Sequence, residues 1–135
     1  MRQPRGSLTA AQYEIMEAVW KAGEEGIAVA DIWQEIGQTR EIGRTTVLNQ
    51  VDRLEKRGWL RRVPGEGTTR FRAALGKEDA SRQLVAGFVS DYFQGRAVDL
   101  VSALLGDAAR DLTKNDVDRL RKLLDKARRG EGGQS

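Results

Sequence analysis

Side chains of the types that bind nucleic-acid bases recur in one stretch of the sequence, residues 44–53. Asparagine and glutamine can bond adenine bidentately, arginine can do so with guanine, and threonine or leucine can touch a thymine methyl group. Val47, Val51 and Leu54 fall at positions i, i+4 and i+7 of an amphipathic helix, which predicts a polar face opposite them. We expect this helix to begin near residue 44 or 45 and to end at Gly58. Its base-reading set would be Arg44, Thr45, Thr46, Leu48, Asn49, Gln50 and Arg53.

The amino end of this helix offers a second kind of contact. Thr45 and Thr46 lie where exposed backbone amides could hold a phosphate group. An ordinary solvated polar face remains the alternative for any single residue of the set. The whole set, opposite a complete apolar stripe, favours base reading.

A basic β-hairpin is predicted directly after this helix. Residues 59–63 and 68–73 have strand character, and the Pro64-Gly65-Glu66-Gly67 segment between them has the composition of a turn. Phe71 and its neighbours two positions away share one face of the second strand, which leaves the arginines on the other. Arg70 and at least one more are expected to touch backbone phosphate, as positioning contacts, although charges also protect exposed strand edges. The candidates are Arg61, Arg62, Arg70 and Arg72.

Two earlier helices are expected to support the base-reading helix. Thr9 and Gln12 have the spacing of a capping box, and the helix that they open would run to about Ala22. A short strand or extended segment over 27–29 and a second helix over about 30–36 would follow. Three helices followed by a basic hairpin are typical of a winged helix-turn-helix, so the predicted fold is mainly α with a small β-hairpin.

The charge distribution agrees with this arrangement. The formal charge is +3, but residues 40–72 hold nine basic and four acidic side chains, a net +5, whereas residues 1–39 carry −3 and residues 73–135 carry +1. The basic segment coincides with the third helix and the hairpin. Binding to DNA through such cations weakens steeply with salt.

Composition excludes several classes of function. The chain has no Cys and no His, so it cannot form a disulfide framework, a zinc–thiolate cluster or a histidine-based triad. Gly65-Glu66-Gly67 lies in a hairpin turn and not in a phosphate-binding loop. We expect a protein that is not an enzyme, with no cofactor, no metal and no catalytic residues, and the sequence identifies no small-molecule effector.

The last third of the chain predicts self-association. Its apolar stripes are too wide for three appended helices to hide alone, and pairing of two copies is the usual solution, although folding back on the winged helix in a monomer is the alternative. The expected dimerisation residues are Leu84, Phe88, Tyr92, Phe93, Val101, Leu104, Leu105, Leu120 and Leu124.

No apolar run is long enough to span a membrane and the amino terminus is not a signal peptide, so we expect a cytoplasmic protein without a membrane partner.

These motifs together resemble one known family, the penicillinase-repressor (BlaI/MecI) type of winged-helix regulator. The resemblance covers roughly residues 7–127. Its most specific parts are Thr45-Thr46-Val47 and Arg53-Leu54-Glu55-Lys56-Arg57-Gly58-Trp59-Leu60, with Leu8-Thr9, Phe93-Gln94-Gly95, Leu112-Thr113 and Leu120-Arg121-Lys122-Leu123-Leu124 around them.

The resemblance implies a homodimeric transcriptional repressor that binds a palindromic operator in double-stranded DNA. In the family a membrane-bound sensor protease triggers cleavage within the dimerisation helices, and the corresponding bond here is Ala103-Leu104. Three departures matter. Leu48 and Gln50 stand where the family more often has a basic and an apolar residue, so the resemblance leaves the operator sequence open. Ala103 replaces an asparagine common in the family, so proteolytic release and β-lactam induction stay open. The absence of cysteine excludes the thiolate copper sensing of related repressors.

The predicted domains are therefore a winged-helix DNA-binding domain over 7–75, a helical dimerisation domain over 77–128, and a disordered tail over 129–135. A winged helix that serves only protein–protein assembly, without specific DNA binding, is the competing hypothesis.

Overall fold

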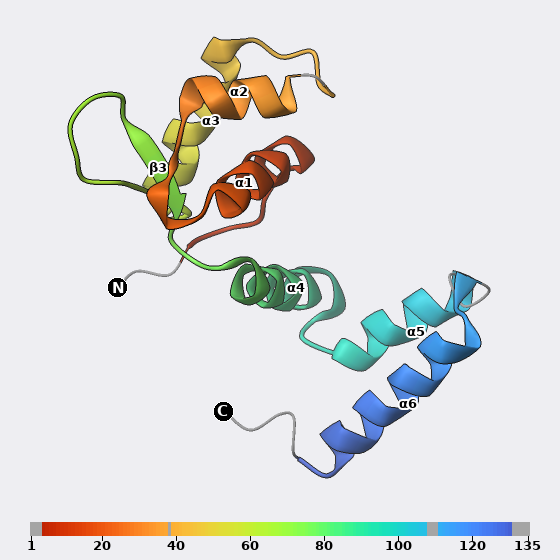
Figure 1. Cartoon of the computed structure of the whole chain (residues 1–135). Helices are drawn as coiled ribbons and strands as arrows, with labels where there is room; N and C mark the ends of the chain where they lie inside the picture. Colours follow the sequence, from red (N-terminus) through yellow and green to blue (C-terminus); the bar gives the residue numbers. More distant parts are fainter. Residues whose placement is uncertain (1–3, 38, 108–110, 131–135) are drawn as a thin grey trace. The chain divides into compact units, whose positions relative to one another are not determined.

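The computed structural model describes residues 4–37, 39–107 and 111–130. The amino-terminal elements are α1 (Ala10–Ala22), the short 3-10 helix η1 (Gly23–Glu25), β1 (Ile27–Ala28), α2 (Val29–Ile36), α3 (Arg44–Lys56), β2 (Leu60–Arg62) and β3 (Arg70–Ala73). The chain continues with α4 (Lys77–Phe93), α5 (Ala97–Asp107) and α6 (Lys114–Arg128) (Figure 1).

The chain divides into two compact units, and the boundary along the sequence lies between Tyr92 and Phe93. Almost all of α4 therefore belongs to the first unit. The predicted functional boundary between residues 75 and 77 lies at the start of α4 instead, and that functional division remains a prediction. Of the predicted tail, residues 131–135 lie outside the described part of the chain.

The start of α1 confirms the predicted capping box. The Thr9 hydroxyl accepts a hydrogen bond from the Gln12 amide at 3.1 Å, and the Gln12 side chain accepts one from the Thr9 amide at 3.0 Å. Two of the backbone donors that a helix start leaves unpaired are thus satisfied. At the other end Gly23 has φ 78°, a backbone conformation that glycine adopts without steric cost.

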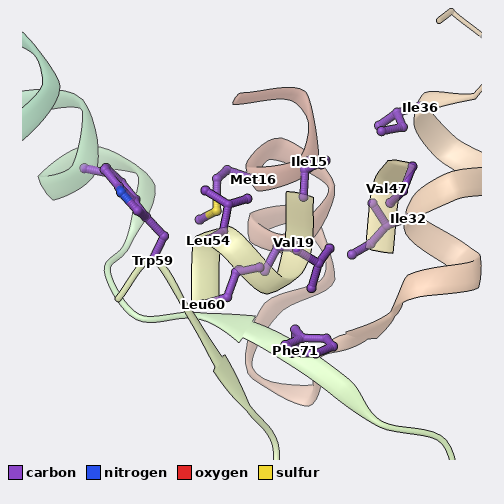
Figure 2. Packing of buried hydrophobic residues seen from close by; sticks show 12 residues of the cluster. Ile15, Met16, Val19, Ile32, Ile36, Val47, Leu54, Trp59, Leu60 and Phe71 are labelled. Atoms are coloured by element: carbon purple, nitrogen blue, oxygen red, sulfur yellow. The ribbon is translucent and has the colours of Figure 1, made fainter. Parts of the chain in front are cut away.

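One apolar core holds the first unit together. Figure 2 shows its side chains converging from the helices and the hairpin. Its principal members are Ile15, Met16, Val19, Ile32, Ile36, Val47, Val51, Leu54, Trp59, Leu60 and Phe71. Trp20 and Trp33 lie at its edge, where their indole N–H groups donate to the carbonyls of Leu75 and Ile42, both at 2.9 Å.

The sheet contains one strand more than the predicted hairpin. Its order is β1-β3-β2, all antiparallel, and Ile27 pairs with Phe71. The segment expected as a short strand or an extended entry is a strand, and it completes a three-stranded sheet. Gly26 has φ 83°, and a Cβ there would come within 2.7 Å of a Val63 methyl group, so the absence of a side chain lets β1 approach the hairpin. The fold is a winged helix-turn-helix, mainly α with a small sheet.

A buried amide links α1 to α3. Gln12 is only 6% exposed, and its side-chain NH₂ donates to the Gln50 side chain at 2.8 Å while its carbonyl oxygen accepts from Arg57 at 3.4 Å. Together with the Thr9 cap, these contacts use both ends of the amide. A buried polar group is tolerable only when its hydrogen bonds are made.

Replacing Gln12 by Ala should lower the free energy of unfolding by about 1–3 kcal/mol, because the cap bond and the bond to Gln50 are lost together. Urea denaturation measures this. Gln50→Ala is the matched control and should cost less, and the double variant should be less unstable than the two single losses summed. Strict additivity would show that the two amides do not support one another.

The second unit consists of α5, α6 and their flanking residues. Thr113 and Asp116 repeat the capping box at the start of α6, with both hydrogen bonds at 3.0 Å. The Thr113 amide that donates to the Asp116 carboxylate holds the pKa of Asp116 below its usual value. None of the described side chains from residue 93 to residue 130 is buried. No helix in the described ranges is long and apolar enough to cross a bilayer.

Candidate nucleic-acid interface

The outer face of α3 is open to solvent. Its apolar stripe, Val47, Val51 and Leu54, is fully buried, which turns the opposite face outward. Gly43 precedes the helix without a side-chain cap, and the first turn carries no acidic residue, so its amides and the positive end of the helix dipole can receive an anion. The exposed members of the predicted base-reading set are Arg44, Thr45, Thr46, Leu48, Asn49 and Arg53.

Two members of that set are held in place by neighbouring helices. The Arg44 guanidinium lies 5.7 Å from the centre of the Trp33 ring, a cation–π distance. Gln50 is half-buried, and its side-chain oxygen is taken up by Gln12. Arg44 is thus positioned by α2 at the start of α3, while Gln50 keeps only its NH₂ group for an outside partner.

The hairpin formed by β2 and β3 is the wing of this fold, and its four arginines fall into two pairs. Arg62 forms an ion pair with Glu55 at 2.8 Å and lies 5.4 Å from the Phe71 ring centre, and the hydrogen bond to Glu55 raises the pKa of Arg62. Arg72 binds Glu24 at 3.1 Å. Arg61 and Arg70 have no ion-pair partner in the described part of the chain. Contact with an outside anion therefore costs Arg61 and Arg70 no internal bond.

A further arginine of the basic segment serves the fold. Arg57 donates to the backbone oxygens of Arg5, at 2.9 Å, and of Ser7. The Arg5 oxygen also accepts from the Trp59 indole at 2.9 Å. Burial, with a smaller contribution from the Arg5 charge, lowers the pKa of Arg57. Arg57 thus ties the residues before α1 to the end of α3, a role that the sequence did not indicate.

The cations left for an external partner are fewer than the net charge suggests. Four of the nine basic side chains in residues 40–72 are engaged internally: Arg40 with Glu14 at 2.9 Å, Arg57, Arg62 and Arg72. Those without such a partner in the described structure are Arg44, Arg53, Lys56, Arg61 and Arg70. Arg44, Arg53 and Lys56 lie on α3, and the other two lie on the hairpin.

The predicted dimerisation residues differ in exposure. Leu84 packs partly against the core of the first unit, and Phe93 is partly buried. The others are exposed, with Tyr92 at 71% and Leu124 at 62% the most open; the remainder are Phe88, Val101, Leu104, Leu105 and Leu120. The Ala103-Leu104 bond lies inside α5, and both residues are exposed.

The described residues offer no metal-binding cluster. No group of three or more Asp or Glu side chains is arranged to hold a metal ion within those ranges. What the structure brings together is an open polar helix face, a free helix start and unpaired arginines on an adjacent hairpin.

A winged helix with these surfaces defines a class, the winged-helix regulators that bind DNA. Residues 8–126 match the family model described as penicillinase repressor. The chain belongs to the penicillinase repressor family, and it is a winged-helix transcriptional repressor that binds DNA.

Individual relatives are distant. The methicillin resistance regulatory protein MecI of Mammaliicoccus sciuri is 21% identical over 119 residues, 88% of this chain and 94% of that protein. Among solved structures, the monomeric BlaI of Bacillus licheniformis in complex with the blaP half-operator is 20% identical, with a TM-score of 0.48 over 58% of this chain and 93% of that one. The oxidised form of MarR from E. coli is 22% identical, with a TM-score of 0.47 over 89% and 75%.

Proposed function

We propose that the protein represses transcription as a cytoplasmic homodimer on a palindromic operator, with residues 7–75 binding DNA and residues 77–128 forming the dimer. The observation that carries the DNA-binding role is the exposed polar face of α3 beside the unpaired Arg61 and Arg70. Arg53 and Asn49 would read bases from the middle of the exposed face. The wing would hold backbone phosphate and set the register.

The dimer is supported by the apolar surface of the second unit. Large side chains of α5 and α6, such as Val98, Leu104, Leu123 and Leu124, are each more than half exposed, and no described side chain of this unit is buried. Exposed apolar faces on this scale mark interaction surfaces. A second copy offers the same faces in return and closes the assembly by twofold symmetry.

Release by a sensor protease is the further step that we propose for this repressor. The Ala103-Leu104 bond is exposed, but it lies within α5, so α5 must unwind locally before the bond can enter a protease. A cut there would remove α6 from the dimerisation domain. Mass spectrometry should then show a fragment ending at Ala103.

A gel-shift series with DNA from upstream of the chain's own gene tests the DNA-binding role. If four or five cations of each protomer contact phosphate, the slope of log affinity against log salt should be about −7 to −9 for a dimer. No binding at low salt would instead favour a winged helix that only assembles with another protein.

Arg70→Ala should weaken binding by a similar factor on all DNA sequences and reduce the salt slope by about one per protomer. Arg72→Ala is the matched control on the same strand and should change the slope less, because Arg72 must first leave Glu24. Equal effects of the two substitutions would show that the internal ion pair does not decide which wing arginine binds DNA.

A further inference from the structure

A cleft of about 930 Å³ opens in the first unit, and none of its lining residues belongs to α3 or to the hairpin. One wall is formed by residues 6–10 and by α1 with Tyr13, Glu14 and Glu17, and the other is formed by α4. The volume lies within the range of small-molecule sites, about 300–1,000 Å³. The DNA-binding role does not use this cleft, whereas Leu84, Phe88 and Tyr92 of its lining are also among the predicted dimerisation residues.

Three aromatic side chains line the cleft. Tyr13 lines one side, and Phe88 and Tyr92 line the other with their ring centres 4.9 Å apart. Tyr92 is 71% exposed, so its ring is available to a ligand. Aromatic faces attract organic cations, most strongly when the cation is shielded from water.

The charges of the lining have one sign. Glu14, Glu17 and Asp91 line the cleft, and no Lys or Arg does. Glu14 is paired with Arg40, and Glu17 lies 3.7 Å from Lys77, whereas Asp91 has no ion-pair partner among the described residues. The lining therefore combines aromatic surface with an uncompensated carboxylate.

Gly87 leaves room in the α4 wall. A Cβ built on this residue meets no atom within 4 Å. Glycine inside a helix is less favourable than alanine, so the local helix would be more stable with a side chain there. The position thus offers a way to fill the cleft without disturbing neighbouring atoms.

We propose that this cleft binds small organic cations with an aromatic body. Tyr13, Phe88 and Tyr92 would enclose the apolar part, and Asp91 would face the positive charge. The proposal rests on the first unit alone and does not depend on DNA binding. A small cation fits better than a large partner, because the cleft is concave and limited in volume and because, among the described residues, Asp91 leaves one unpaired negative charge in its lining.

Tetraphenylphosphonium and tetraphenylborate test the proposal, since they share size and shape and carry opposite charge. Calorimetry on the full chain without DNA should show binding of the phosphonium at least tenfold tighter than of the borate. Gly87→Trp should weaken phosphonium binding at least tenfold, Gly87→Ala should leave it unchanged, and Asp91→Asn should weaken it about two- to fivefold.

Equal binding of the two ions, or no effect of Gly87→Trp, would overturn the proposal. Sedimentation of the wild type and of Gly87→Trp covers the main competing occupant, a second copy of the chain. If the phosphonium does not bind and Gly87→Trp shifts the monomer–dimer equilibrium, the cleft is part of the dimer interface and the ligand site is refuted. Because no DNA is present, either failure leaves the proposed repressor function to be judged separately.

Discussion

Replacing Leu120 and Leu124 of α6 by Asp is expected to make the repressor monomeric and to lower its affinity for a two-half-site operator by about 10²- to 10⁴-fold. The two side chains are 38% and 62% exposed in the single chain. In the proposed dimer they become buried, and an unpaired carboxylate cannot be buried there without a large desolvation cost. The loss would come from avidity, because each half-site contact stays intact.

Sedimentation equilibrium and gel shifts on whole and half operators measure the two parts of this prediction. Affinity for a half operator should be unchanged, since α3 and the wing are untouched. Leu120→Met combined with Leu124→Met keeps both positions apolar and should remain dimeric. A dimer that survives the Asp substitutions with full operator affinity would place the interface elsewhere.

Proteolysis between Ala103 and Leu104 would lower operator affinity for the same reason, because the two half-site contacts would no longer be linked in one dimer. Removing the chain beyond residue 103 takes away α6 and its apolar face. The proposed release mechanism therefore requires no change in the DNA-binding surface.

The parts of the fold that were predicted correctly depend on local sequence. Thr9 and Gln12 are three residues apart, and a capping box needs only that spacing. Val47, Val51 and Leu54 are buried as their helical period predicts. Side chains alternate between the two faces of β3, which likewise places Phe71 in the core and leaves Arg70 exposed.

The partners of the candidate site residues could not be predicted in this way. Gln50 looks like any outward polar residue of α3, yet its oxygen is bound by Gln12, 38 positions away. Arg72 finds its carboxylate in η1, 48 positions away. Such pairs are fixed by how elements pack, so periodicity on one element does not reveal them. For β1 the sequence left a short strand and an extended entry open, and the pairing with β3 decides for the strand.

Contacts within the protein indicate which residue of α3 is the best candidate for reading a base. Arg44 is stacked over Trp33 and Gln50 is half used by Gln12, whereas Arg53 is exposed and has no internal ion-pair partner in the described structure. Arginine also makes the commonest specific contact in the major groove, a bidentate bond to guanine. We therefore expect Arg53 to contribute the largest share of specificity.

Arg53→Ala should reduce operator affinity by about 1–3 kcal/mol, roughly 5- to 150-fold. Competition gel shifts with operator and with unrelated DNA provide the measurement. Loss confined mainly to the operator indicates base reading, whereas an equal loss on both would reduce Arg53 to a phosphate contact. Arg53→Lys is the matched control, because lysine keeps the charge but lacks the planar fork for two parallel bonds. The urea midpoint should not move in either variant, since Val51 and Leu54 carry the packing of this turn, so a fall in affinity reports the interface and not the fold.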